Sequence, residues 1–408
     1  MNKNKKINRI IDKKLNMYNM NYYFNFGYKN FGPLLYSFSI WLKKELEKEE
    51  LNKVFFLSRD GFILKEAFDM MFKDEFKSFY LYASRRSVIV PSLWKVKSPL
   101  EIFDCMTLGR SITLNSFIKK IGLEDYDLSN FLSKYNLIVD EKYKPDVFKN
   151  DEKVLKFLND IFPIICENSK REWNSFNSYA DNNSFKGNVA IVDIGWYATM
   201  QQAITKIRAN VSVKGYYLGM YPGDGYYSKE CAKGFIVDKT HDQKNFDIIN
   251  LFITIFEFLT LARHGSVKRF IENDNGVEFY EYEYANLREK NISEEIQKGA
   301  LQFIEDFQNT DESKVYCKLE NAIENLIHKC IYPNYEDAKM LGDILFSNDE
   351  LKHIAKPKNI KFYILHPKIF FKDFYECNWK IGFLKRLFVI KLPYYKVVVF
   401  LKNRRNGG

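Results

Sequence analysis

A strand, a short polar turn and a helix follow one another twice in this chain, and both turns carry Asp and Gly. Residues 54–68 read VFFLSRDGFILKEAF, and residues 188–207 read NVAIVDIGWYATMQQAITKI. In each segment an apolar run leads into a turn and then into apolar residues at helical spacing. Further apolar strands are predicted within 76–93 and 212–222. Strands that alternate with helices predict an α/β layered domain with a mainly parallel sheet.

The rest of the chain is predicted to be largely helical. An amphipathic helix is expected from about Pro33, and an apolar helix is expected over 246–270. Residues 271–285 are predicted to form a hairpin around Asn275-Gly276. The expected organisation is a basic leader (1–21), an α/β catalytic domain (22–285) with a helical insertion at about 99–180, a helical region (286–350) and a basic aromatic tail (351–408).

Charge and composition exclude several classes of protein. The formal net charge of the 408 residues is +10, but residues 351–408 hold fourteen Lys or Arg against two acidic residues, and residues 1–14 hold six against one. The acidic central body disfavours a nucleic-acid enzyme, which would line its main groove with cations. The six cysteines are scattered, which disfavours a zinc site or a disulfide framework. No long apolar run or signal peptide is recognisable, so a cytoplasmic location is expected.

The tail alternates bulky apolar residues with Lys and Arg. Residues 379–405 read WKIGFLKRLFVIKLPYYKVVVFLKNRR, and Pro393 divides them into two short segments. This composition is typical of a segment in a membrane interface, where basic residues meet anionic lipid. The alternative is that the segment packs on the domain with a solvated basic face. The aromatic residues expected to enter the headgroup layer are Trp379, Phe383, Phe388, Tyr394 and Tyr395.

Three strand-end turns, SRDG, ASRR and DIGW, are expected to meet at one edge of the sheet. They bring two carboxylates, Asp60 and Asp193, together with Arg59, Arg85 and Arg86. Carboxylates hold Mg²⁺ and arginines bind phosphate oxygens in a bidentate manner, so this set suits a magnesium-bound polyphosphate.

Other residues of these turns are candidates for binding the donor phosphates. Gly61 and Gly195 permit close approach of the backbone, and the helices that follow direct their N-termini at the anion. Structural alternatives remain open: Asp60 as a helix cap, the Arg pair bound to surface carboxylates, His264 and Ser266 as a helix end. Trp196 is also consistent with the core, and Glu257 with either the site or a pair with Arg263.

Five motifs, FGYKNFGPLLYSF, VFFLSRDGFILKEAF, YLYASRRSVIVPS, VAIVDIGWYATMQ and EFLTLARHGSVKRF, resemble in this order the glycan phosphoribosyltransferase module of bacterial ribofuranosyltransferases. The resemblance spans about residues 22–270. That module is often fused to a haloacid dehalogenase-like (HAD-like) phosphatase in surface-polysaccharide biosynthesis, and its fold is distinct from that of classical phosphoribosyltransferases. No phosphatase signature precedes residue 22, so a separate phosphatase is implied. Tyr197-Ala198 also departs from the small residue pair common after the DIGW turn.

The resemblance implies a glycosyltransferase of capsule or O-antigen assembly that moves a 5-phosphoribosyl unit from phosphoribosyl diphosphate to a glycan or lipid-linked glycan. We expect it to require Mg²⁺ and to lie at the inner face of the membrane. The alternatives are a HAD-like sugar-phosphate phosphatase or phosphotransferase with Asp60 as nucleophile, and a non-catalytic membrane-associated scaffold. Asp60 and Asp193 are the expected catalytic residues and metal ligands. The expected donor-binding residues are Arg59, Gly61, Ser84, Arg85, Arg86, Gly195, Trp196, His264 and Ser266.

Overall fold

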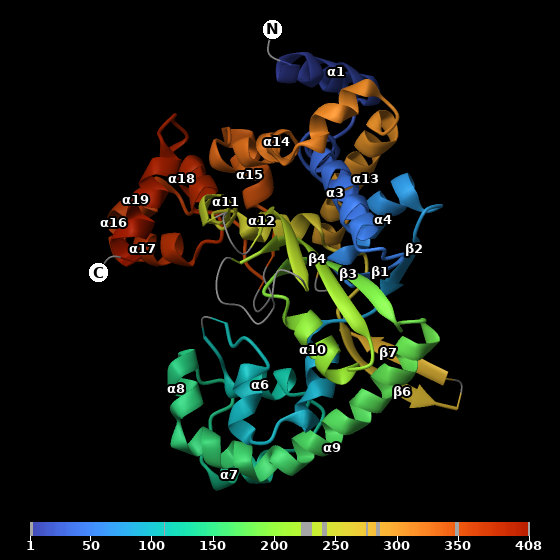
Figure 1. Cartoon of the computed structure of the whole chain (residues 1–408). Coiled ribbons are helices and arrows are strands. Elements are labelled where there is room, and N and C mark those ends of the chain that lie inside the picture. The colour runs from blue at the N-terminus through green and yellow to red at the C-terminus, as the bar shows by residue number, and fades with distance from the viewer. Residues whose placement is uncertain are drawn as a thin grey trace.

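A five-stranded, all-parallel sheet lies at the centre of the molecule, with strand order β2-β1-β3-β4-β5 (Figure 1). The computed structural model describes residues 3–109, 111–221, 231–238, 243–274, 276–282, 286–346 and 351–406. The strands are β1 (Lys53–Leu57), β2 (Lys77–Leu81), β3 (Asn188–Trp196), β4 (Ser212–Met220) and β5 (Ala232–Val237). The predicted α/β layered architecture is confirmed.

The central strands β1 and β3 each contain a continuous apolar run because helices cover both faces of the sheet. Val54 and Phe56 of β1 face one core, and Phe55 and Leu57 face the other. The helices of the first face are α2 (Tyr22–Phe26), α3 (Gly32–Lys48), α4 (Gly61–Phe72) and α13 (Leu287–Phe307). The second face is covered by α5 (Arg85–Ile89), α9 (Glu152–Asn182), α10 (Thr199–Ile207) and the hairpin of β6 (Val267–Asn273) and β7 (Gly276–Glu281).

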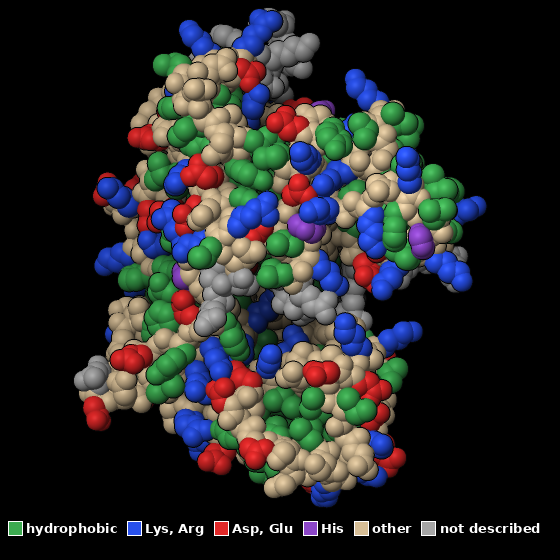
Figure 2. All heavy atoms as spheres, turned by 180° about the vertical axis from the view of Figure 1, so that it is seen from behind, with side chains coloured by type: hydrophobic (Ala, Val, Ile, Leu, Met, Phe, Trp, Pro, Cys, Tyr) green, Lys and Arg blue, Asp and Glu red, His purple; other side chains and the backbone are tan. Residues whose placement is uncertain are grey.

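The helical insertion forms a lobe below the sheet in Figure 1. It contains α6 (Leu114–Lys120), α7 (Ser129–Lys134) and α8 (Pro145–Asn150), which pack with the long helix α9. The opposite side of the molecule is hollowed between this lobe and the body that holds the sheet, and basic side chains lie in the hollow (Figure 2).

The C-terminal third is helical, as predicted. It continues from α13 through α14 (Leu319–Ile331) and α15 (Tyr335–Gly342) into a group of four helices at the side of the molecule (Figure 1). These are α16 (Ile360–Leu365), α17 (Pro367–Glu376), α18 (Lys380–Phe388) and α19 (Tyr394–Asn406). The break at Pro393 is confirmed, since α18 and α19 lie on either side of it.

Glycines allow the N-terminal helices to approach α13 very closely. A Cβ atom at Gly27 would lie 1.8 Å from the carbonyl oxygen of Ile296, and one at Gly299 would lie 2.0 Å from that of Phe24. Gly27 opens a single π-helical turn (Gly27–Phe31) between α2 and α3. The FGYKNFG motif therefore serves helix packing in this structure.

The N-terminal segment is itself a helix, α1 (Lys3–Tyr18). Ile11 and Leu15 of this helix are buried in the core, and Tyr18 donates a hydrogen bond to Asp306 of α13 (2.9 Å). The basic leader is thus attached to the body on its apolar side.

Several predicted boundaries are wrong in detail. Strand β5 was not predicted, and Asp193, Gly195 and Trp196 lie within β3 rather than in a turn after it. The helix predicted over 246–270 is two helices, α11 (Gln243–Ile249) and α12 (Ile253–Leu259), and β6 begins at Val267. The hairpin therefore starts before residue 271, and Asn275 lies outside the described residues.

The tail requires a larger correction. Trp379, Phe383 and Tyr394 are buried in the core instead of being available to a membrane, because the C-terminal helices pack on α14 and α15. The indole of Trp379 donates to the carbonyl of Cys330 (2.9 Å). Tyr395 is partly buried, and Phe388 is exposed. None of the helices in the described ranges has both the length and the apolar character needed to cross a bilayer.

Candidate functional site

The candidate site lies at the carboxyl ends of β1 and β3, where the order of the strands reverses. From β1 the chain crosses to β2 on one side, and it later returns to β3 on the other. In open parallel sheets such a switch point is where ligands bind. Asp60 follows β1, and Asp193 stands one residue beyond Val192, which is paired with Phe56 of β1. The two predicted carboxylates therefore lie at the same edge of the sheet.

Asp60 occupies the N-cap position of α4 but makes no capping hydrogen bond with its side chain. Its carboxylate instead accepts a hydrogen bond from the hydroxyl of Thr260 (3.3 Å), which follows α12. The helix-cap alternative thus does not explain this aspartate. A carboxylate that is directed away from its own helix is available for other chemistry.

The two aspartates and their surroundings perturb one another's ionisation. Burial raises the pKa of Asp60, although the charges of Arg59 and Arg85 act to lower it. Burial also raises the pKa of Asp193 to about 8, and the charge of Asp60 adds to this increase. Both side chains nevertheless retain partial exposure to solvent. A nearby cation or a bound proton stabilises carboxylates in such a low-dielectric position.

A third carboxylate, Glu257 of α12, belongs to the same electrostatic group. Burial raises its pKa to about 7, with a further contribution from Asp60, while Arg85 and Arg59 oppose the shift. Of the two alternatives for Glu257, the structure places it with the site residues. The side chain of Arg263 lies instead over the ring of Phe62, 5.1 Å from its centre.

Arg59 and Arg85 supply positive charge to this group. Both interact electrostatically with Asp60, Asp193 or Glu257. Arg85 is the first residue of α5 and is exposed, and Arg59 is half-buried. Within the part of the chain that the structure describes, neither guanidinium is engaged in a hydrogen bond or a close ion pair. Their donors therefore remain available to an anionic ligand.

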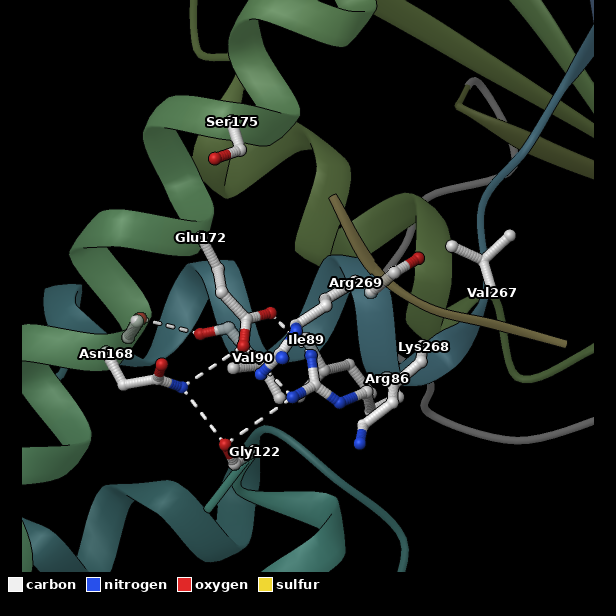
Figure 3. Close-up of polar contacts among 12 residues, drawn as sticks. Arg86, Ile89, Val90, Gly122, Asn168, Glu172, Ser175, Val267, Lys268 and Arg269 are labelled. Atoms are coloured by element: carbon white, nitrogen blue, oxygen red, sulfur yellow. Dashed lines mark hydrogen bonds and ion pairs between the residues drawn. The ribbon is translucent and has the colours of Figure 1, made fainter. Parts of the chain in front are cut away.

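Arg86 is placed differently from the prediction. Its guanidinium faces the insertion lobe, where Nη2 lies 3.0 Å from Oε1 of Glu172 (Figure 3). Its Nε lies 3.3 Å from Oε1 of Glu124. It also donates to the carbonyl of Gly122, which accepts from Asn168 as well. These contacts bind α5 to α9 and to the loop after α6. Arg86 is therefore a structural residue in this conformation.

Ser84 is also used by the fold. Its hydroxyl accepts a hydrogen bond from the amide of Ser87 (3.0 Å), which caps α5, and donates to the carbonyl of Val267 (2.6 Å). The hydroxyl thereby fixes α5, and with it Arg85, against β6. Ser84 thus positions its neighbour rather than offering a free group.

The glycines and the tryptophan of the turns shape the edge of the sheet. Gly61 begins α4 close to β1, since a Cβ there would lie 3.0 Å from the carbonyl carbon of Phe56. Gly195 has φ +104°, and a Cβ would lie 2.3 Å from the carbonyl oxygen of Gly219. Trp196 and Ala198 also adopt positive φ, +78° and +53°. Strained backbone of this kind is often found at functional sites.

The side chain of Trp196 is 4% exposed and packs in the core, as the alternative interpretation held. Its indole nitrogen has no hydrogen-bond partner among the described residues.

His264 lies in a second polar group beside the aspartates. Its Nε2 is 2.7 Å from the hydroxyl of Tyr80, and its Nδ1 is 3.0 Å from the carboxylate of Glu281. The charge of Asp60 contributes to raising the pKa of Tyr80, after burial, which is the larger cause. Ser266 joins this region through its carbonyl, which accepts from the amide of Tyr282. Sequence reasoning missed Tyr80, because a tyrosine within a strand carries no signal of its partner.

The described residues contain no group of three His, Cys, Asp or Glu side chains arranged to hold a metal. Mg²⁺ in phosphate-binding sites is commonly held by one or two carboxylates together with oxygens of the substrate. Asp60 and Asp193 provide oxygen ligands of that type. The raised pKa of each aspartate shows that its charged form is destabilised in the free protein, and a bound cation would offset this. The residues present therefore fit Mg²⁺ that arrives with a phosphorylated ligand.

Comparison of the sequence with known protein families and with curated proteins finds no match.

Proposed function

We propose that this protein is a glycosyltransferase that takes 5-phosphoribosyl from phosphoribosyl diphosphate and transfers it to a glycan acceptor in the assembly of a bacterial surface polysaccharide. The observation that carries this proposal is the pairing of Asp60 and Asp193 with the unengaged guanidiniums of Arg59 and Arg85 at the switch point. Carboxylates for a metal and arginines for phosphate suit a magnesium diphosphate ester. The motif resemblance selects the ribosyl donor among such esters.

The chemistry assigned to the chain is displacement at the anomeric carbon. The acceptor hydroxyl forms a bond to that carbon, and the bond to the diphosphate oxygen breaks with its electron pair on the leaving group. Arg85 and Arg59 stabilise the charge that develops on the diphosphate. Either Asp60 or Asp193 receives the proton of the acceptor hydroxyl. The other aspartate would hold Mg²⁺, which would supply further neutralisation of the leaving group.

Two features of the expected biology remain part of the proposal. A separate phosphatase would remove the 5-phosphate after transfer, and the enzyme would act at an anionic membrane surface from the cytoplasmic side. The basic C-terminal helices support the second feature, because each cation near such a surface contributes about 1 kcal/mol of attraction.

The proposal is tested by donor binding. Phosphoribosyl diphosphate with Mg²⁺ should raise the melting temperature, since a ligand at a hundredfold excess over its Kd stabilises the native state by about 2.7 kcal/mol. Arg85→Ala should abolish most of this shift. Arg404→Ala is the matched control, because Arg404 is exposed on α19, far along the chain from the site. An unshifted melt of the wild type over millimolar donor would contradict the proposal.

The same protein distinguishes the alternatives. A phosphatase or phosphotransferase would form a covalent phosphoenzyme on Asp60 with a sugar phosphate, visible as an acid-stable or hydroxylamine-sensitive mass increase. A scaffold would bind vesicles and show no donor-dependent shift.

A further inference from the structure

An apolar groove lies on the surface between α17, α18 and α19. Its volume is about 320 Å³, and every side chain that lines it is aliphatic or aromatic. The lining includes Phe371 and Phe374 of α17, Phe388 of α18, and Val397 and Leu401 of α19. The volume lies at the lower end of the range for ligand pockets, about 300 to 1,000 Å³. The groove has the size and character of a site for a hydrocarbon chain.

Exposed apolar residues continue from the groove along the connection between α18 and α19. Val389, Ile390 and Leu392 are 55%, 58% and 48% exposed, and Leu392 also lines the groove. Phe400 of α19 is 56% exposed. Apolar surface that continues over neighbouring helices marks an interaction site in a soluble domain. In Figure 2 the C-terminal helices form the lobe on the right, where hydrophobic and basic side chains alternate over the surface.

The charge around the groove selects its partner. Lys372, Lys391 and Lys396 are exposed and stand next in sequence to the lining residues Phe371, Leu392 and Val397. The tail has two acidic residues, and one of these, Asp373, accepts a hydrogen bond from Tyr363 (2.8 Å). A second copy of this chain would bring cations against cations across a two-fold interface. An apolar chain that carries an anionic head meets both features of the surface.

We propose that the groove of α17, α18 and α19 binds an acyl chain of an anionic membrane phospholipid, while the flanking lysines contact its phosphate. The inference deepens the proposed association with a membrane and rests on that part of the proposed function. It assigns lipid contact to the groove and to residues 388–392, whereas the buried Trp379 and Phe383 take no part. Lysine side chains reach past an apolar surface to the headgroup layer readily.

The test is cosedimentation of the full chain with vesicles of phosphatidylcholine alone and with vesicles of equal parts phosphatidylcholine and phosphatidylglycerol. Val397→Trp fills the groove at a half-exposed position and should weaken binding to the anionic vesicles about tenfold, which corresponds to two methylene groups left in water. Ile364→Trp is the matched control, because Ile364 is 71% exposed on α16 and does not line the groove. It should bind like the wild type.

Leu392→Asp is the second groove variant. It places a carboxylate at the exposed mouth of the groove, so it should fold even if Val397→Trp does not, and it should also lose binding. Lys391→Glu combined with Lys396→Glu should reduce binding to the anionic vesicles and weaken its dependence on salt.

Equal binding of wild type and both groove variants would overturn the proposal, as would equal binding of the wild type to both kinds of vesicle. A dimer in the absence of lipid that Val397→Trp dissociates would identify a second copy as the occupant instead. The donor-induced melting shift, measured on the same variants, separates the two proposals. Groove variants that lose vesicle binding but keep the donor-induced shift support the lipid-binding groove. A wild-type protein that binds vesicles but shows no donor-induced shift contradicts the proposed transferase activity and leaves the groove proposal standing.

Discussion

The hydroxyl of Thr260 lies 3.3 Å from the carboxylate of Asp60, although 200 residues of chain separate them. This hydrogen bond joins the start of α4 to the end of α12, and it favours the ionised form of Asp60 against the effect of burial. Glu257 lies one helical turn before Thr260, and its backbone carbonyl is 3.2 Å from the same hydroxyl. One threonine thus orients the aspartate from the helix that carries the third carboxylate.

Thr260→Val should raise the pKa of Asp60 further, because the substitution removes a donor and keeps the shape of the side chain. We expect the acidic limb of the pH dependence of donor transfer to move to higher pH, with kcat at low pH reduced more than kcat at high pH. The measurement is a pH profile of kcat. Thr254→Val, on the same helix, is the control and should leave the profile unchanged.

Asp193→Asn should make the free protein more stable at alkaline pH. The pKa of Asp193 is raised from 3.8 to about 8, so the native state binds more protons than the unfolded state between these values. Stability therefore falls as pH rises from about 4 to about 8, and the substitution should remove part of this decline. Urea denaturation at about pH 5 and about pH 9 measures the difference. An equal change in stability between these two pH values in the wild type and in Asp193→Asn would contradict the assignment.

Asp60→Asn and Asp193→Asn should each slow transfer, and the one that removes the general base should lower the rate by about a hundredfold to ten-thousandfold. The residue that acts as the base should lower kcat with little change in donor affinity. A metal ligand should instead weaken the binding of magnesium and donor. Calorimetric titration of donor at several magnesium concentrations, together with kcat, assigns one role to each aspartate.

Arg86→Ala should destabilise the protein by about 3 to 5 kcal/mol, since it leaves the buried carboxylate of Glu172 without its charged partner, although Asn168 still donates a hydrogen bond to it (3.1 Å). Arg85→Ala, at the adjacent position, should change the stability of the free protein by less than about 0.5 kcal/mol. The two variants form a matched pair for denaturation and for donor binding. If Arg85→Ala is the more destabilising, the division of roles between the two arginines is wrong.

Gly299→Ala should destabilise by about 1 to 3 kcal/mol, as expected when a methyl group is forced into a filled contact. The added Cβ would lie 2.0 Å from the carbonyl oxygen of Phe24, and backbone on both sides leaves it no room to move. The neighbouring Lys298→Ala, on the exposed side of α13, should be nearly neutral. Thermal denaturation of both variants gives the comparison.

The central strands of the sheet were predictable from the sequence, but the outer strand β5 was not. The strands β1 and β3 contain the continuous apolar runs VFFL and VAIV because both of their faces are buried, and such runs are visible without any structure. Strand β5, AKGFIV, includes a lysine and a glycine, so it resembles a loop in composition. Its place in the sheet comes from pairing with β4, which is a tertiary contact.

The grouping of the two aspartates with Arg59 and Arg85 was predictable from the sequence, but the separate position of Arg86 was not. Adjacent residues of a helix project about 100° apart, so of Arg85 and Arg86 only one is directed towards the aspartates. Which one depends on Glu172, and nothing in the ASRR turn reports on a carboxylate 86 residues away. The prediction for the tail was wrong for a related reason. Composition indicated an interfacial segment, but the tertiary fold determines which aromatic side chains face the core.

The close crossing of the N-terminal helices with α13 makes the order of synthesis matter. Tyr28 is fully buried and donates to Asp306, which is 278 residues later. At the usual rates of translation, about 5 to 20 residues per second, Asp306 leaves the ribosome roughly 15 to 55 seconds after Tyr28. During that interval the apolar side of α2 and α3 is not yet covered by α13. A chain that stops before α13 (Leu287–Phe307) lacks the helix that packs on α2 and α3, and it therefore leaves the aromatic ring of Tyr28 without its contact to Phe303.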